Sequence, residues 1–233
     1  MTRTIERGTG RPLRGGYKDA DGCKVPSVTT ITGRYKDSGA LIGWAYGQGK
    51  KGVPLYEARD KAGDIGSCVH DMVEADLHGE DAEEVLRQAT PYTCDGPDET
   101  FVGSVRKGYA AYQAWWATTN MRVVATEVPL VHPTLGFAGT LDAIAETHDG
   151  RLVVLDWKTS KGVYLGMYAQ VCAYAELWGA CRKEPIFAAH IIRYSKTGAG
   201  FHHHHYPDLR PGWVYFTHLL AAYKAESAAK EML

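Results

Sequence analysis

Two acids, a lysine and a helical glutamine–tyrosine pair lie close together in the chain between residues 139 and 174. Asp142 closes a Gly-x-x-Asp segment, and Asp156 and Lys158 form an Asp-x-Lys triplet further along. Two carboxylates can hold a hard divalent cation, which neutralises a phosphate and makes hydroxide from water. A nearby lysine adds a fixed positive charge at the attacked phosphorus. The pattern therefore indicates metal-dependent phosphodiester hydrolysis.

The segments that carry these acids have the composition of β-strands. Apolar and β-branched residues dominate three stretches bounded by turn signals, at 123–131, 137–145 and 152–157. The tripeptide at 148–150 suits a three-residue hairpin loop, in which Gly150 can take a positive φ. The second and third stretches are therefore predicted to form a hairpin.

The hairpin register determines where the acids lie. If Thr147 pairs with Arg151, counting inward places Asp142 opposite Asp156. Opposed Cβ atoms on one sheet face are about 4.5–5.5 Å apart, close enough for both carboxylates to hold one ion. The two-residue period of a strand then places Lys158 on the face of Asp156.

An Asp–Lys pair on a strand is also common as a solvated surface pair. Here the apolar run 153–155 precedes Asp156 and predicts a largely buried strand. Charges next to such a run are costly unless they are paired or bound to metal. This burial favours a functional site over a surface pair.

Two helices contribute further polar side chains. Gln170 and Tyr174 are four residues apart on a helix predicted over 164–178, so they share one face. An amide and a phenol suit phosphate contacts, and the alternative is that Tyr174 is a core aromatic and Gln170 a surface residue. His70 and Glu74 are likewise four apart on a helix predicted over 57–78.

The order of these motifs resembles the PD-(D/E)XK nuclease superfamily. Gly-x-x-Asp, Asp-x-Lys-Thr and a helix with Gln-x-x-x-Tyr follow one another as in its RecB-type branch, which includes small phage exonucleases and CRISPR-adaptation nucleases. That branch also has a helix with a histidine before the sheet, which residues 66–70 match. The resemblance spans about residues 25–220. It implies an α/β fold with a mixed central sheet flanked by helices, a restriction-endonuclease-like core.

The resemblance also implies a metal site. Asp142, Asp156, the Trp157 carbonyl and His70 would bind Mg²⁺ or Mn²⁺, and the imidazole favours Mn²⁺. Glu74 would either join them or orient His70. Where many relatives have Glu in the triplet, this chain has Asp156, and either residue can bind metal.

The remaining motif residues would act on the substrate. By the same resemblance, Lys158 positions the attacking water and stabilises the transition state. Gln170 and Tyr174 would help to place the substrate near the metal.

The cysteines set this chain apart from relatives that hold an iron–sulfur cluster with one early and three late cysteines. No C-x-x-C pair occurs, and no cysteine follows Cys181. We therefore expect neither a cluster nor a disulfide framework. The five cysteines are Cys23, Cys68, Cys94, Cys172 and Cys181.

Charge is unevenly distributed although the net charge is only -1. Residues 1–61 contain 12 Lys/Arg and 6 Asp/Glu, whereas residues 62–100 contain 1 and 11. The cationic part, which includes Lys50 and Lys51, could approach a phosphate backbone, or both parts could be ordinary solvated faces. No long apolar run or signal peptide is evident, so we expect a soluble, cytoplasmic protein of a bacterial or phage-infected cell.

We expect a flexible basic segment at 1–24 and a single nuclease domain at 25–233. Residues 25–32 are predicted to be extended, 47–54 a loop, and 186–194 and 200–206 strands. Strand alternation should split the tract His202–His205 between two faces, which argues against a shared metal site. Arg193 is a weaker candidate for a phosphate contact.

The predicted function is an exonuclease on linear DNA, of the phage recombination or DNA-processing type. A site- or structure-specific endonuclease and a catalytically inactive DNA-binding module are the alternatives. A recombination protein or a single-strand-binding protein is a conceivable partner. Polarity, strand preference and oligomeric state stay open.

Overall fold

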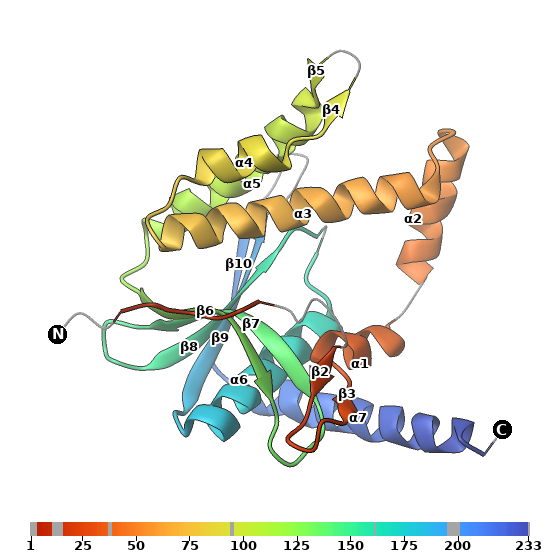
Figure 1. The fold of residues 1–233 in the computed structure, drawn as a ribbon, viewed down its shortest axis with the longest axis vertical. Helices are drawn as coiled ribbons and strands as arrows, with labels where there is room; N and C mark the ends of the chain where they lie inside the picture. The colour runs from red at the N-terminus through yellow and green to blue at the C-terminus, as the bar shows by residue number, and fades with distance from the viewer. Residues whose placement is uncertain are drawn as a thin grey trace.

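The computed structural model describes residues 4–10, 16–36, 39–93, 96–160, 162–194 and 201–232. A six-stranded sheet with the order β1-β6-β7-β8-β9-β10 forms its centre (Figure 1). Its strands are β1 (Glu6–Arg7), β6 (Arg122–Val131), β7 (Ala138–Glu146), β8 (Leu152–Lys158), β9 (Ile186–Tyr194) and β10 (Phe201–Tyr206).

The sheet is mixed. Strands β6, β7 and β8 are antiparallel, β8 and β9 are parallel, and β10 runs antiparallel to β9 at one edge. The parallel pair is joined by a crossover through a helix, as parallel neighbours require. The predicted α/β class with a mixed central sheet is confirmed.

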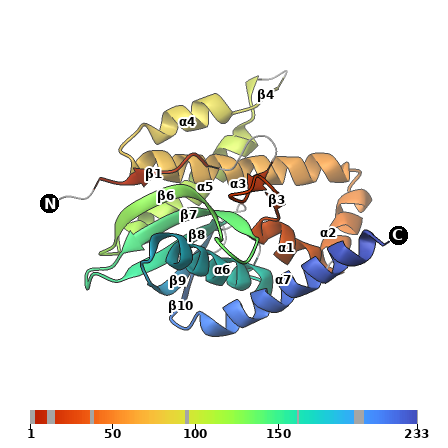
Figure 2. The same cartoon turned by 60° about the horizontal axis from the view of Figure 1, so that its bottom comes forward.

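Helices cover both faces of the sheet, as Figures 1 and 2 show. Two groups of helices each pack on one face of the sheet, and an apolar core lies between the sheet and each group. The first group is α1 (Val28–Arg34), α6 (Leu165–Arg182) and α7 (Arg210–Lys230). The second group is α3 (Leu55–Leu77), α4 (Ala82–Ala89) and α5 (Glu99–Trp116).

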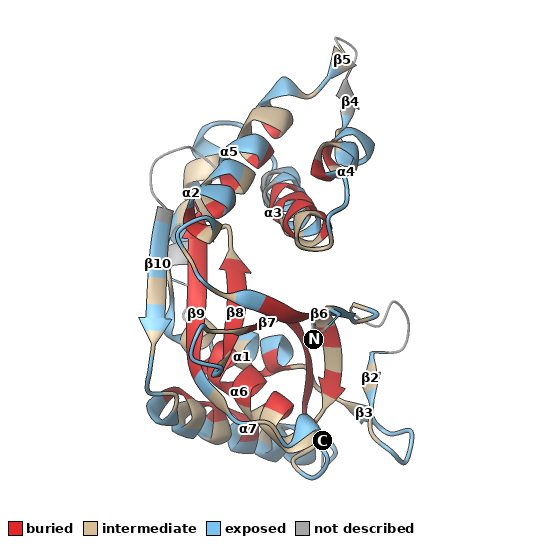
Figure 3. Ribbon diagram, turned by 90° about the vertical axis from the view of Figure 1, so that its left-hand side faces the viewer, coloured by how far each residue is buried: buried red, intermediate tan, exposed pale blue. Residues whose placement is uncertain are grey.

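The central strands alternate between these two cores. Val154 of β8 contacts the α6 side, whereas Val153 and Leu155 contact the α3–α5 side. Burial on both faces explains the continuous apolar runs of β8 and β9, which Figure 3 shows as buried ribbon. Strand β10 at the edge is largely exposed.

The prediction that residues 25–32 are extended is wrong for most of this stretch. Only Lys24–Val25 form a strand, β3, which pairs with β2 (Tyr17–Lys18), and a helix begins at Val28. Ser27 caps this helix, because its side chain accepts a hydrogen bond of 3.0 Å from the Thr30 amide. The cap and the burial of Val28 and Ile31 outweigh the strand preference of the β-branched residues.

The loop predicted at 47–54 is also shorter than expected. Helix α2 (Gly39–Lys50) continues through Gly47 and Gly49 to Lys50. The connection between the strands predicted at 186–194 and 200–206 lies outside the described residues. A small hairpin of β4 (Tyr92–Thr93) and β5 (Gly96–Pro97) precedes α5.

The N-terminal segment contributes to the sheet. Strand β1 pairs in parallel with β6, and Arg7 donates to Glu74 at 2.9 Å and to Glu80 at 2.5 Å. The division of the chain at residues 24 and 25 stays a prediction. Across the described part of the chain, no helix combines the length and apolar character needed to cross a membrane.

Candidate active site

The predicted hairpin between β7 and β8 is present in the expected register. Ala143 pairs with Leu155, and the ladder runs down to the loop, where the Thr147 amide donates to the Arg151 carbonyl at 2.9 Å. Gly150 takes a φ of 81° in that loop, a conformation that glycine adopts without strain. Asp142 and Asp156 therefore follow directly beyond the last ladder pair.

Asp142, on strand β7, contacts both strand β8 and helix α3. Its Oδ2 accepts a hydrogen bond of 3.0 Å from the Trp157 amide. The same oxygen lies 3.7 Å from His70 Nδ1, and its side chain is only 10% exposed. The Trp157 indole packs edge-on against Tyr112 and Trp115 of α5, which holds this end of β8 in place.

Asp156 is completely buried, with an exposed fraction of 0%. Lys158, two residues along the same strand, places its Nζ 2.5 Å from Asp156 Oδ2. Gln170 of α6 places its Nε2 3.4 Å from Oδ1 and donates to the Tyr174 hydroxyl at 2.9 Å. A buried carboxylate of this kind is tolerated because a cation and an amide contact it.

The helical pair thus faces the acids. Gln170 is buried rather than exposed, so the alternative of a surface glutamine is wrong. Tyr174 is both a core aromatic and a hydrogen-bond partner of Gln170. The core position of Tyr174 is therefore observed, and its part in placing the substrate stays a prediction.

Gly139 makes room for the Tyr174 ring. A Cβ built at residue 139 would lie 2.6 Å from Cε1 of Tyr174 and 3.3 Å from Cδ1 of Leu177. We expect Gly139→Ala to lower the free energy of unfolding by about 1–3 kcal/mol, because an overpacked core must shift. Urea unfolding measures this, and Gly166→Ala, with 3.8 Å to its nearest atom, is the control. Equal stability of the two variants would contradict the close packing.

Glu74 contacts the N-terminal strand. Its Oε1 accepts from Arg7 Nε at 2.9 Å, and Glu80 contacts the same guanidinium. Hydrogen bonds from Arg7 to Glu80 and Glu74 raise the pKa of Arg7. An orienting role of Glu74 toward His70, one turn away on α3, stays a prediction.

Two residues near the carboxyl end of β9 also belong to this region. Arg193, which pairs with Lys158 in register, is buried and donates from Nη1 to the Ser160 carbonyl at 3.0 Å. It therefore holds the loop that follows Lys158, a contact different from the predicted phosphate contact.

Tyr194 is the residue that sequence reasoning missed. It is 1% exposed, and its hydroxyl has no hydrogen-bond partner among the described residues. Burial, and then the charges of Asp142 and Asp156, raise the pKa of Tyr194. The parallel pairing of β8 with β9 brings it here, and only that long-range register could have revealed it.

The donor set fits a divalent cation by its chemistry. Asp142 and Asp156 are two carboxylates with little or no exposure, and Lys158 offsets only one of their charges. Oxygen donors with one imidazole, His70, suit Mg²⁺ or Mn²⁺. In the part of the chain that the structure describes, no three His, Cys, Asp or Glu side chains are already gathered as a metal cage.

The histidine tract alternates as predicted. His203 and His205 stack against His190 of β9, with ring centroids 4.9 and 4.6 Å away, while His202 and His204 stack on one another. The tract is thus divided between the two faces of β10 and lies on the edge strand.

His190 gives a pH-dependent prediction. Burial, and then the nearby His203 and His205, lower the pKa of His190 to about 3. Below pH ~6.5 His190 binds a proton in the unfolded chain but stays neutral in the folded chain. The free energy of unfolding therefore falls as the pH falls toward 3. At pH 5 we expect His190 to cost about 2 kcal/mol relative to pH 7. In urea unfolding, His190→Phe should lose less stability between these pH values; an unchanged difference would contradict the assignment.

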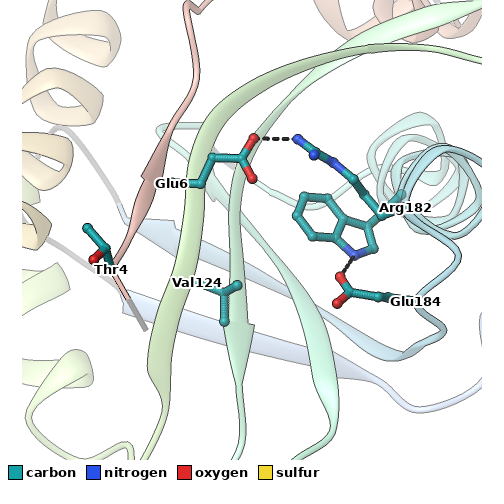
Figure 4. A pocket seen from close by; sticks show the side chains of 6 residues that line it. Thr4, Glu6, Val124, Arg182 and Glu184 are labelled. Carbon is teal, nitrogen blue, oxygen red and sulfur yellow. Dashed lines mark hydrogen bonds and ion pairs between the residues drawn. The ribbon is translucent and has the colours of Figure 1, made fainter. Parts of the chain in front are cut away.

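A cavity near the N-terminal strand lies away from these residues. It has a volume of about 360 Å³ and is shown in Figure 4, where Arg182 forms an ion pair with Glu6 and the Trp178 indole donates to Glu184 at 3.2 Å. None of the proposed catalytic side chains lines it. We therefore place the candidate active site at the Asp142–Asp156 end of the sheet.

Comparisons with known proteins identify the family. Residues 43–201, more than half of the chain, match the PD-(D/E)XK nuclease superfamily. The chain therefore belongs to the PD-(D/E)XK nuclease superfamily. The matched range contains His70, both acids, Lys158 and the Gln170–Tyr174 pair.

Solved structures resemble the chain only distantly. A protein from Eubacterium rectale described as a candidate exonuclease is 14% identical, with a TM-score of 0.45, covering 67% of this chain and 63% of that one. SSO0001 is 15% identical, with a TM-score of 0.33, covering 69% and 74%. Comparison with curated proteins gives no match.

Proposed function

We propose that this nuclease hydrolyses phosphodiester bonds of DNA with Mg²⁺ or Mn²⁺ and that it is an exonuclease of the RecB type. The observation that supports the proposal is that two contact pairs, His70–Asp142 and Lys158–Asp156, lie on neighbouring positions of β7 and β8, where the Trp157 amide donates to Asp142. Two acids beside a lysine and an imidazole are side chains that metal-assisted phosphate hydrolysis can use.

Asp142, Asp156, His70 and the Trp157 carbonyl would hold the cation. When bound, the cation supplies charge neutralisation at the phosphate and lowers the pKa of water. Asp142 is already oriented by the Trp157 amide, so its carboxylate is positioned before any ligand binds.

The other side chains act directly on the reacting groups. Lys158 extends from the same strand as Asp156 and can orient the attacking water and stabilise charge on the phosphorus oxygens. Gln170 Nε2 donates to the Tyr174 hydroxyl and contacts Asp156 at 3.4 Å, and it would help to place a phosphate beside Asp156 by exchanging the longer contact for a phosphate oxygen. A linear DNA end, a phage recombination or DNA-processing pathway and a cytoplasmic location all belong to this proposal.

Removal of metal is expected to abolish cleavage. Because the proposed ligands are mostly hard oxygens, activity should disappear in EDTA and return with Mn²⁺ or Mg²⁺. The measurement is a gel assay on linear and on covalently closed circular DNA, with each metal and with EDTA. Full activity in excess EDTA would refute the mechanism, and cleavage of circular DNA would identify an endonuclease instead.

A further inference from the structure

The arm formed by α2 and the first turns of α3, residues 39–59, carries two exposed tyrosines. Tyr46 is 66% exposed and has Lys50 Nζ 5.0 Å from its ring centroid. Tyr56 is 70% exposed and has the Arg59 guanidinium carbon 5.2 Å from its ring centroid. Each ring thus offers an open aromatic surface next to a cation, which favours an anionic partner with flat groups.

The face of α2 that carries Tyr46 is open to a ligand. Ile42, Tyr46 and Lys50 follow one another at four-residue spacing, so they form one stripe along the helix, and Ile42 is also exposed. A Cβ built at Gly43 or at Gly47 would have no other atom within 4 Å. A chain can therefore approach the helix closely beside the tyrosine.

The charge of the arm is positive where the rings lie. Residues 39–56 contain Lys50 and Lys51 and no acidic residue. Arg59 is also an ion-pair partner of Asp60, so the two lysines are the main source of uncompensated charge on α2 and the adjoining turn. This charge complements phosphate.

The position of the arm connects it to the site. Figure 1 shows α2 at the end of α3 that is remote from α4. Fourteen residues of the same helix separate Tyr56 from His70, a distance of about 21 Å at 1.5 Å per residue. A third ring, Tyr164 at the start of α6, lies with Lys36 5.6 Å from its centroid, on the helix that carries Gln170.

We propose that the arm binds single-stranded nucleic acid, with bases stacked on Tyr46 and Tyr56 and phosphates neutralised by Lys50 and Lys51. The faces of bases in a duplex are already stacked on one another, so exposed rings recognise unpaired bases. The inference rests on the proposed function and specifies the strand state that this nuclease holds near its site.

The test measures binding in EDTA by fluorescence anisotropy. The two ligands are a labelled oligothymidylate of about 20 nucleotides and a blunt duplex of equal length. For the double variant Tyr46→Ala/Tyr56→Ala, we expect single-strand affinity to fall about 30-fold, because each lost stack weakens binding several-fold. Duplex affinity should change by less than about twofold. Both tyrosines are exposed, so the variant should fold.

Three comparison variants separate stacking from other effects. Tyr46→Phe/Tyr56→Phe keeps both rings and should bind like the wild type. Phe187→Ala removes an exposed ring that has Arg151 5.9 Å away, at the opposite end of β9 from Arg193, and should also bind like the wild type. Lys50→Ala/Lys51→Ala should lower the affinity for both ligands and reduce the salt dependence of binding.

Several outcomes would overturn the proposal. If the tyrosine-to-alanine variant loses affinity equally for the single strand and the duplex, the arm contacts phosphates without stacking on bases. If it loses affinity for neither, the arm does not bind nucleic acid through its tyrosines. Sedimentation that shows a dimer in the wild type and a monomer in that variant, with unchanged oligothymidylate binding, would identify the arm as a self-association surface.

The same proteins are assayed for cleavage with Mn²⁺. A wild type that cleaves no DNA but binds oligothymidylate through its tyrosines refutes the nuclease proposal and leaves the binding inference intact. A wild type that cleaves DNA, with a tyrosine variant that binds oligothymidylate equally well, refutes the inference alone.

Discussion

Replacing Lys158 with alanine is expected to slow DNA cleavage by about two to three orders of magnitude, the usual loss when one electrostatic group that acts in the transition state is removed. Lys158 Nζ lies 2.5 Å from Asp156 Oδ2, so its charge is held at the acid pair. An ammonium is no metal ligand, so metal binding should survive the change. The measurement is the single-turnover rate on linear DNA with Mn²⁺.

Lys107→Ala provides the matched control, because Lys107 is an exposed lysine on α5. It should cleave at the wild-type rate. If Lys158→Ala also cleaves at that rate, the ammonium has only a structural role and the proposed assignment of the triplet is wrong.

The same ion pair has a consequence for stability. Asp156 is completely buried, and removing one partner of a buried pair leaves a charge that the core tolerates poorly. Lys158→Ala should therefore be less stable than the wild type in EDTA. If Asp156 binds metal, Mn²⁺ should restore part of this loss by mass action. These two readouts distinguish a folding defect from a chemical one.

The contacts among the candidate residues that the sequence predicts correctly depend on short-range rules. The loop around Gly150 determines the hairpin register, and the two-residue period of a strand then positions Asp142, Asp156 and Lys158. The four-residue spacing of a helix likewise places Gln170 and Tyr174 together.

Long-range pairing accounts for what the sequence does not reveal. Tyr194 reaches the acids only because β9 lies parallel to β8, and Arg7 reaches Glu74 because β1 pairs with β6. No local pattern in either segment specifies its partner strand. The helix at Val28 shows the opposite error, since a capping hydrogen bond from one serine outweighs a β-branched run.

Asp142→Asn is expected to separate DNA binding from chemistry. The change removes a proposed metal ligand, so cleavage should fall by about three orders of magnitude or more. It also removes a negative charge that repels the DNA backbone. Binding of DNA without metal should therefore be equal to or tighter than that of the wild type, as measured by anisotropy in EDTA.

The structure indicates that this variant should fold. Asp142 Oδ2 accepts the Trp157 amide at 3.0 Å, and an asparagine oxygen can accept the same hydrogen bond. Asp142→Ala cannot, so it should leave the Trp157 amide without this partner and lose about 1–3 kcal/mol of stability. The asparagine variant thus isolates the charge, whereas the alanine variant also removes the hydrogen bond.

The contrast between the two variants determines what Asp142 does. Loss of cleavage in Asp142→Asn with retained binding and stability places the carboxylate charge in the chemistry itself. Loss of DNA binding in Asp142→Asn without unfolding would instead assign Asp142 to substrate recognition and contradict the proposed metal site. His70 Nδ1 lies 3.7 Å from the same Asp142 oxygen. If the two residues hold a metal, His70→Ala should reduce cleavage. If Asp142 serves only substrate recognition, His70→Ala should leave cleavage unchanged.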